Sequence, residues 1–164
     1  RIGLEIVKRL RDGFGINFIY YDLKRNEQVE KDFGVQFVSL EDLMKNSDFV
    51  SIHVPLTPET KHLVGDKELR LMKKTAYLIN TSRGAVIEEA ALVKVLQERL
   101  IAGAGLDVYE NEPKLSEGLM QLDNVVLLPH IASASFDTRS KMSEMAAQNI
   151  VAVLSGQAPI NPIN

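Results

Sequence analysis

The sequence has 164 residues, 45% hydrophobic and 25% charged, which is typical of one globular domain. A formal net charge of -3, without a long run of one sign, argues against a nucleic-acid-binding or membrane-binding surface. The absence of cysteine excludes disulfide scaffolds and thiolate metal sites and favours a cytoplasmic protein. No apolar run approaches the ~18 residues of a membrane span, no signal peptide is visible, and the sequence begins at Arg1 rather than at a methionine.

Helices and strands are predicted to alternate along the whole chain. Apolar spacing and capping residues predict the helices, and short apolar runs predict the strands. Continuous apolar strands alternating with helices predict an α/β fold, a doubly wound parallel sheet with helices on both faces. The expected elements are a helix over 2–11, strand 17–21, helix 26–33, strand 35–38, a helix capped by Ser39, strand 48–54, a helix capped by Asp66, strand 76–79, helix 88–100, strand 102–108, strand 125–128 and helix 136–154.

Two residues near the start are typical of a dinucleotide-binding unit. Gly3 opens the first helix and would be the third glycine of Gly-x-Gly-x-x-Gly, whose earlier glycines and strand would lie upstream. Asp22 ends the next strand, about 20 residues on, where an acid binds the adenosine ribose hydroxyls. A carboxylate there repels a 2'-phosphate, which favours NAD over NADP. Lys24 and Arg25 follow at once, however, and could either bind that phosphate or be solvated loop cations.

Three chemically distinct side chains follow three separate strands: Arg83, Glu112 and His130. The carboxyl ends of parallel strands share one edge, so all three are expected to gather there. A guanidinium binds a carboxylate through two parallel hydrogen bonds, and an imidazole gives and takes a proton near neutral pH. Glu112 would accept a hydrogen bond from the far ring nitrogen and orient the ring. These are the groups that reduction of a 2-oxo acid by a nicotinamide hydride requires.

Each assignment has an alternative. Arg83 could be a surface cation, and Glu110 competes with Glu112 for the acidic role. His53 and His62 are alternative bases. No carboxylate or histidine group has metal-ligand spacing, so we expect no metal.

The chain resembles the nucleotide-binding domain of the D-isomer-specific 2-hydroxyacid dehydrogenases from residue 1 to about residue 161. The motifs that carry the resemblance are HVPLTPET at 53–60, NTSRG at 80–84, GLDV at 105–108, EP at 112–113 and PH at 129–130. It implies Arg83, Glu112 and His130 as the catalytic set, with His130 as proton donor. It implies cofactor contacts from Arg1 and Ile2 at the pyrophosphate, Asp22 at the ribose, and Val54 and Pro55 along the adenosine. It also places Thr81 and Asp107 near the nicotinamide, with Asp107 on the carboxamide. Further cofactor contacts are expected from Ser82, Arg83, His130 and Ala132.

The resemblance also implies an activity. Members reduce small 2-oxo acids to D-2-hydroxy acids with NAD(P)H and carry a second, flavodoxin-like substrate domain. We therefore expect an N-terminally truncated Rossmann-like domain over 1–157, without its first strand, and the start of a return segment over 158–164. Alone, these 164 residues should be inactive.

Substrate and assembly are expected from the same resemblance. The loop at 56–60 and residues 131–134 are most similar to glyoxylate or hydroxypyruvate reductases, with phosphoglycerate dehydrogenases close behind. A homodimer through this domain is expected. Two other readings remain open, a nucleotide-sensing corepressor or scaffold of the same fold, and a truncated inactive paralogue.

Overall fold

The computed structural model describes residues 2–162, with backbone only at residue 12. The chain forms two compact units, residues 1–129 and 130–164. The predicted division after residue 157 remains a prediction.

Helices and strands alternate through the first unit, as predicted. In chain order its elements are α1 (Ile2–Phe14), β1 (Ile19–Tyr20), α2 (Glu27–Phe33), β2 (Gln36–Phe37), α3 (Leu40–Asn46), β3 (Phe49–Ile52), α4 (Asp66–Leu71), β4 (Tyr77–Asn80), the 3-10 helix η1 (Gly84–Val86), α5 (Glu89–Gln97), β5 (Gly103–Leu106), the 3-10 helix η2 (Leu119–Gln121) and β6 (Val125–Leu127).

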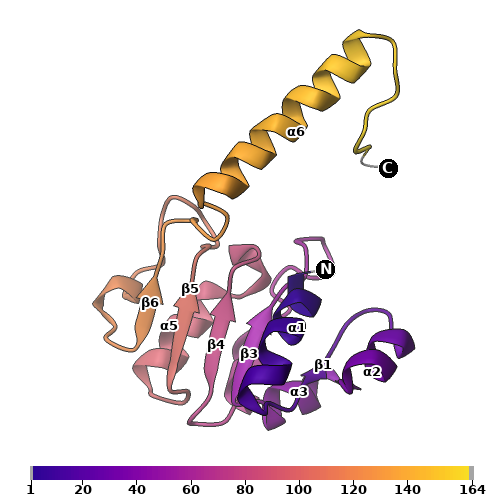
Figure 1. Ribbon diagram of the computed structural model, residues 1–164. Helices are drawn as coiled ribbons and strands as arrows, with labels where there is room; N and C mark the ends of the chain where they lie inside the picture. The colour runs from indigo at the N-terminus through magenta and orange to yellow at the C-terminus, as the bar shows by residue number, and fades with distance from the viewer. Residues whose placement is uncertain (1, 163–164) are drawn as a thin grey trace. The chain divides into compact units, whose positions relative to one another are not determined.

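All strand pairs are parallel. Strands β3, β4, β5 and β6 lie side by side in that order, and β1 pairs with β2 in a separate two-stranded sheet (Figure 1). In a doubly wound fold the first strand of the unit lies between the second and the fourth, which here correspond to β1 and β3. The fold is therefore the predicted Rossmann-type parallel sheet without its first strand.

One face of the four-stranded sheet is buried where β4 and β5 pack against α5. Leu78 of β4 and Leu106 of β5 pack in one apolar cluster with Leu92 and Leu96 of α5, and each is at most 3% exposed. Burial of these side chains stabilises the stack of helix on sheet by roughly 1.5–3 kcal/mol each. This packing holds β4 and β5 in place, and so determines where the loops at their carboxyl ends lie.

The opposite face corrects a prediction. Continuous apolar strands indicated burial on both faces, but Phe49 is 67% exposed and Tyr77 is 45% exposed. Their rings stack on each other with centroids 5.7 Å apart. The described residues therefore bury alternate positions of β3 and β4 instead of every position.

Two predicted helix ends also differ. Helix α1 continues through Gly13 to Phe14, and Gly15 takes the left-handed backbone conformation with φ +61°. Asp66 is the first residue of α4 and Gly65 is its N-cap. The Ser39 cap is confirmed, since its hydroxyl accepts the Asp42 N–H at 3.0 Å.

The second unit contains one long helix, α6 (Phe136–Leu154), over the predicted range. Ser135 caps it, with its hydroxyl accepting the Thr138 N–H at 3.3 Å. Of the helices between residues 2 and 162, none has the length and hydropathy needed to cross a membrane.

Candidate active site and cofactor site

A buried asparagine folds the turn that presents Arg83. Asn80, the last residue of β4, has no exposed surface. Its side-chain nitrogen donates to the Arg83 carbonyl at 3.0 Å. Its Oδ1 accepts from the N–H of Ser82 at 3.0 Å and from the Ser82 hydroxyl at 2.9 Å. Both ends of the buried Asn80 amide are thus hydrogen-bonded within the turn. The Arg83 side chain at the end of this turn is exposed.

The Arg83 guanidinium keeps most of its hydrogen-bonding capacity. One nitrogen, Nη1, donates to the carbonyl of Ser82 at 2.6 Å. Among the side chains that the structure describes, no carboxylate pairs with it. A guanidinium has five N–H donors in a planar fork, so this side chain can bind a carboxylate of a small molecule.

The loop after β5 carries Glu112. Asp107 and Val108 are buried at its start, and Glu112 itself is exposed. Its Oε1 accepts the N–H of Tyr109 at 3.0 Å, so the carboxylate folds back on its own loop. The Tyr109 hydroxyl in turn donates to the carbonyl of Leu128 at 2.8 Å, which ties the loop to the end of β6.

The Arg83 turn and the Glu112 loop pack directly against each other. A Cβ at Gly84 would lie 1.9 Å from the Tyr109 carbonyl carbon and 2.4 Å from the Glu110 nitrogen. The N–H of Asp107 also donates to the carbonyl of Asn80 at 3.0 Å. The structure thus brings these two predicted site loops together at the carboxyl ends of β4 and β5. Sequence reasoning had not identified Asn80 or the close approach at Gly84 as the features that join them.

His130 opens the second unit. It is exposed and has φ +56°, a left-handed conformation that is uncommon for a residue with a side chain. Such backbone strain is concentrated at functional sites. Ala132, also exposed, follows in the same turn, which is closed by the Ala134 N–H donating to the Ile131 carbonyl at 2.9 Å. The meeting of His130 with Arg83 and Glu112 remains a prediction.

The alternative groups have other partners. Nε2 of His62 lies 2.6 Å from Oε1 of Glu110, so these two side chains pair with each other. His53 is half-buried, with Nε2 2.8 Å from the Ser51 hydroxyl. Burial lowers the pKa of His53, which favours its neutral form and makes it a poor proton donor. The side chains that the structure describes include no group of three His, Asp or Glu suited to a metal ion.

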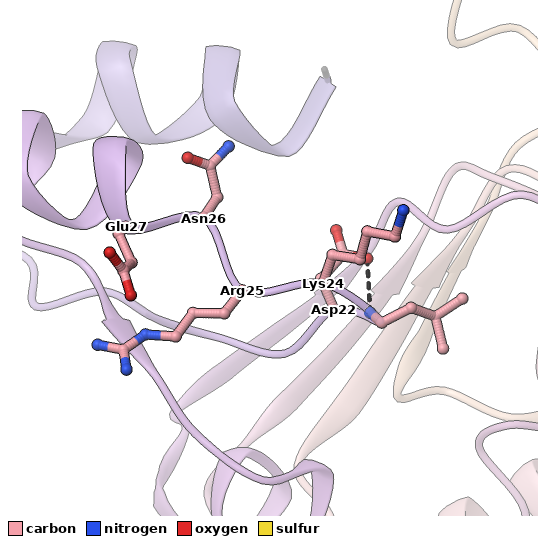
Figure 2. Close-up of a pocket in the computed structure, with 6 residues that line it drawn as sticks. Asp22, Lys24, Arg25, Asn26 and Glu27 are labelled. Atoms are coloured by element: carbon pink, nitrogen blue, oxygen red, sulfur yellow. Dashed lines mark hydrogen bonds between the residues drawn. The ribbon is translucent and has the colours of Figure 1, made fainter.

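Asp22, the residue predicted to bind the ribose, lies just after β1. It is exposed and accepts the N–H of Leu23 at 2.7 Å (Figure 2). It is shared by two adjoining hollows. One is formed by residues 22–27, and the other is walled by Tyr21, Val54, Pro55, Thr57 and Leu63, among others. A carboxylate beside a largely apolar wall fits a ribose and its attached base, so the adenosine half of a dinucleotide fits these residues.

Of the two cationic side chains after Asp22, Arg25 is already paired with a carboxylate. The Arg25 guanidinium makes two hydrogen bonds to Glu30, Nε to Oε1 and Nη2 to Oε2, both at 2.8 Å. Figure 2 shows the Arg25 side chain reaching away from Asp22 and Lys24. Lys24 is exposed.

Helix α1 approaches the same region through Gly3. A Cβ at Gly3 would lie 3.2 Å from Cδ2 of His53, so the small residue permits close packing at the start of the helix. Ile2 is 64% exposed there, and Arg1, predicted to bind the pyrophosphate with Ile2, lies outside the described residues. Thr81 and Ser82 are half-buried in the Arg83 turn.

Known proteins share this sequence and fold. Residues 1–132 match the family described as D-isomer specific 2-hydroxyacid dehydrogenase, NAD binding domain. The glyoxylate reductase of Korarchaeum cryptofilum is 53% identical over 165 residues, which cover 100% of this chain and 49% of that protein. The chain thus spans about half the length of the curated relatives it matches.

Solved structures agree. An NADPH-dependent glyoxylate/hydroxypyruvate reductase from Sinorhizobium meliloti, in complex with NADP and malonate, superimposes with a TM-score of 0.91 at 39% identity, over 99% of this chain and 50% of that one. A D-isomer specific 2-hydroxyacid dehydrogenase from Lactobacillus delbrueckii, in its NAD-complexed form, gives 0.84 at 30% identity, over 99% and 53%. The chain therefore belongs to the D-isomer specific 2-hydroxyacid dehydrogenase family and is its nicotinamide-dinucleotide-binding domain.

Proposed function

We propose that the complete protein containing this chain reduces a small 2-oxo acid to the D-2-hydroxy acid with a nicotinamide cofactor, reversibly. The observation that carries the proposal is the packing of Gly84 on Tyr109, which joins the loops of Arg83 and Glu112 at the carboxyl ends of β4 and β5. In an open α/β sheet this is where ligands bind.

The roles follow from the chemistry of each group. Arg83 has no carboxylate partner among the described side chains, and it binds the substrate carboxylate through two parallel hydrogen bonds. A nicotinamide cofactor held by this domain would supply the hydride for the carbonyl carbon. His130 donates a proton to the carbonyl oxygen from one ring nitrogen, and Glu112 accepts a hydrogen bond from the other. In the oxidative direction His130 takes the proton back.

We propose glyoxylate or hydroxypyruvate as the substrate. Support comes from two relatives named glyoxylate reductase, which are 53% and 52% identical to this chain. The glyoxylate/hydroxypyruvate reductase of Sinorhizobium meliloti, which shares the fold, also supports it. Both acids are small, so the Arg83 contact with the carboxylate forms a large part of their binding. The runner-up substrate class is that of the phosphoglycerate dehydrogenases.

We propose NAD as the preferred cofactor. The exposed carboxylate of Asp22 can accept hydrogen bonds from ribose hydroxyls and repels a 2'-phosphate. Arg25, the stronger of the two potential phosphate ligands, is held by Glu30. Lys24 alone would attract a 2'-phosphate only weakly, because the carboxylate of Asp22 would repel the same phosphate.

Dimerisation through this domain and a cytoplasmic location complete the proposal. Size-exclusion chromatography with light scattering on the complete protein tests the first, and fractionation of the source cells tests the second.

The activity is tested by following NADH oxidation by the complete protein with glyoxylate, hydroxypyruvate and phosphohydroxypyruvate as separate substrates. We expect turnover with the first two and a D-configured product from hydroxypyruvate. NADH binding without turnover of any 2-oxo acid would instead support a nucleotide-sensing role.

A further inference from the structure

A buried carboxylate lies beneath the Glu112 loop. Glu89, the first residue of α5, is only 3% exposed. Its Oε2 accepts the N–H of Glu110 at 2.8 Å, and its Oε1 accepts the N–H of Ser116 at 2.7 Å. A buried carboxylate is costly unless it is hydrogen-bonded, and here both oxygens are satisfied by the main chain of one loop. The two attachments lie on either side of Glu112.

The Glu110 side chain in turn binds the main chain of Glu89. Its Oε2 accepts the N–H of Glu89 at 3.0 Å, and its Oε1 lies 2.6 Å from Nε2 of His62. The Glu89 N–H is one of the first-turn donors of α5 that have no partner inside the helix, so Glu110 caps α5 from the loop side. Burial acts to raise the pKa of Glu110, but the hydrogen bonds from His62 and the Glu89 N–H outweigh it and lower the pKa. Glu110 is therefore ionised at neutral pH.

His62 extends the network to the segment that walls the adenosine hollow. The N–H of His62 donates to the carbonyl of Ala85 at 2.9 Å, and that of Glu88 donates to the carbonyl of Val64 at 3.0 Å. Segment 62–64 is thus bound to the chain that joins the Arg83 turn to α5. The cofactor-side segment, the start of α5 and the Glu112 loop are held together by three side chains: His62, Glu89 and Glu110.

We propose that Glu89 is a positioning residue for the reaction, because its carboxylate, together with Glu110, fixes both ends of the Glu112 loop on α5. The inference rests on the proposed function in giving Glu112 its role beside His130. Glu89 does not itself touch the reacting atoms. It acts through the main chain at Glu110 and Ser116, and so sets where the Glu112 carboxylate can lie.

The test uses Glu89→Gln in the complete protein. Glutamine keeps the volume but places an NH₂ group against one of the two loop N–H donors, so one hydrogen bond is lost and replaced by a clash of donors. Glu98→Gln is the matched control, since Glu98 lies at the other end of α5 and pairs only with Arg70 at the surface, at 3.3 Å. Glu110→Gln, at a less buried position, is the second variant if Glu89→Gln fails to fold.

Two readouts are expected to change together. Amide hydrogen exchange should accelerate at residues 110–116 in Glu89→Gln and stay unchanged in Glu98→Gln. The kcat should fall by about tenfold to a hundredfold, since misplacement by about 1 Å costs that much, whereas the Kd for NADH should stay within about twofold. Adding Glu112→Gln to Glu89→Gln should then cause little further loss.

The outcomes separate this inference from the proposed function. Unchanged exchange at residues 110–116 overturns the positioning role. An equal loss of kcat and NADH affinity also overturns it, because that pattern indicates a general structural defect. If exchange accelerates as expected but Glu112→Gln alone leaves kcat unchanged, the loop attachment stands as described and it is the proposed role of Glu112 that fails.

Discussion

The main chain of Tyr109 crosses so close to Gly84 that a Cβ there would lie 1.9 Å from the Tyr109 carbonyl carbon. The contact is between backbone and backbone, so no side chain can move aside to admit a larger residue. It sets the spacing between the turn that presents Arg83 and the loop that carries Glu112.

Gly84→Ala is therefore expected to separate these two loops. The complete protein should lose stability by about 1–3 kcal/mol, as overpacking typically causes, and should lose most of its turnover. Gly105→Ala is the control, because a Cβ there meets only an Ile79 carbon at 4.0 Å. Urea unfolding and kcat measurements on both variants test this, and wild-type kcat in Gly84→Ala contradicts it.

Replacement of Arg83 should act on substrate binding. Arg83→Gln removes the charge and the two-pronged geometry but leaves the turn, which is folded by Asn80. A hydrogen bond to a charged group is worth about 1.5–3 kcal/mol, so KM for glyoxylate should rise by about tenfold to a hundredfold. Arg99→Gln, a surface arginine paired with Asp123, is the control. An unchanged KM for glyoxylate in Arg83→Gln would show that the carboxylate binds elsewhere.

The sequence predicted the local features of the fold and the site better than the contacts between distant residues. Helix α6 was predicted over its observed range because the signals that begin and end a helix are local in the sequence. The position of Arg83 at the end of β4 was equally local. The contact of Gly84 with Tyr109 was not, because these residues are 25 positions apart and meet only when β4 and β5 pair.

Side chains that depend on distant neighbours were also missed. The apolar character of Phe49 and Tyr77 predicted burial, but exposure is decided by what covers that face of the sheet. No local pattern distinguishes Glu89, because acids are common at helix starts. Its burial follows from the fold of the 110–116 loop over α5, which no pattern near residue 89 indicates.

The pH dependence of stability should reveal Glu110. Its pKa is lowered in the folded protein, so its stabilising contribution is fully present above the unfolded value of about 4.3 and is lost as the pH falls through the folded pKa. The stability difference between wild type and Glu110→Gln should thus shrink as the pH falls below about 4. Thermal unfolding across this range measures it. Glu117→Gln, at an exposed position of the same loop, is the control and should change stability little.

Cofactor preference should depend on Asp22 and little on Arg25. Asp22→Ala removes the acceptor for the ribose hydroxyls and the charge that repels a 2'-phosphate. KM for NADH should rise by about tenfold to a hundredfold, and KM for NADPH should rise less or fall. Arg25→Ala should leave the ratio of the two nearly unchanged, since Glu30 already holds its guanidinium. A large loss of NADPH affinity in Arg25→Ala would show that Arg25 leaves Glu30 to bind the phosphate.

Turnover should depend on His130. His130→Gln keeps a polar side chain but has no group that can give and take a proton near neutral pH, so kcat should fall by about 10²–10⁴-fold while KM for glyoxylate changes little. Histidine is among the residues found more often in the left-handed conformation that His130 adopts, so glutamine can also cost stability, and a thermal unfolding measurement separates that effect from the chemistry. His53→Gln gives the comparison. If its kcat falls as far as that of His130→Gln, with normal NADH binding, the proton donor has been assigned to the wrong histidine.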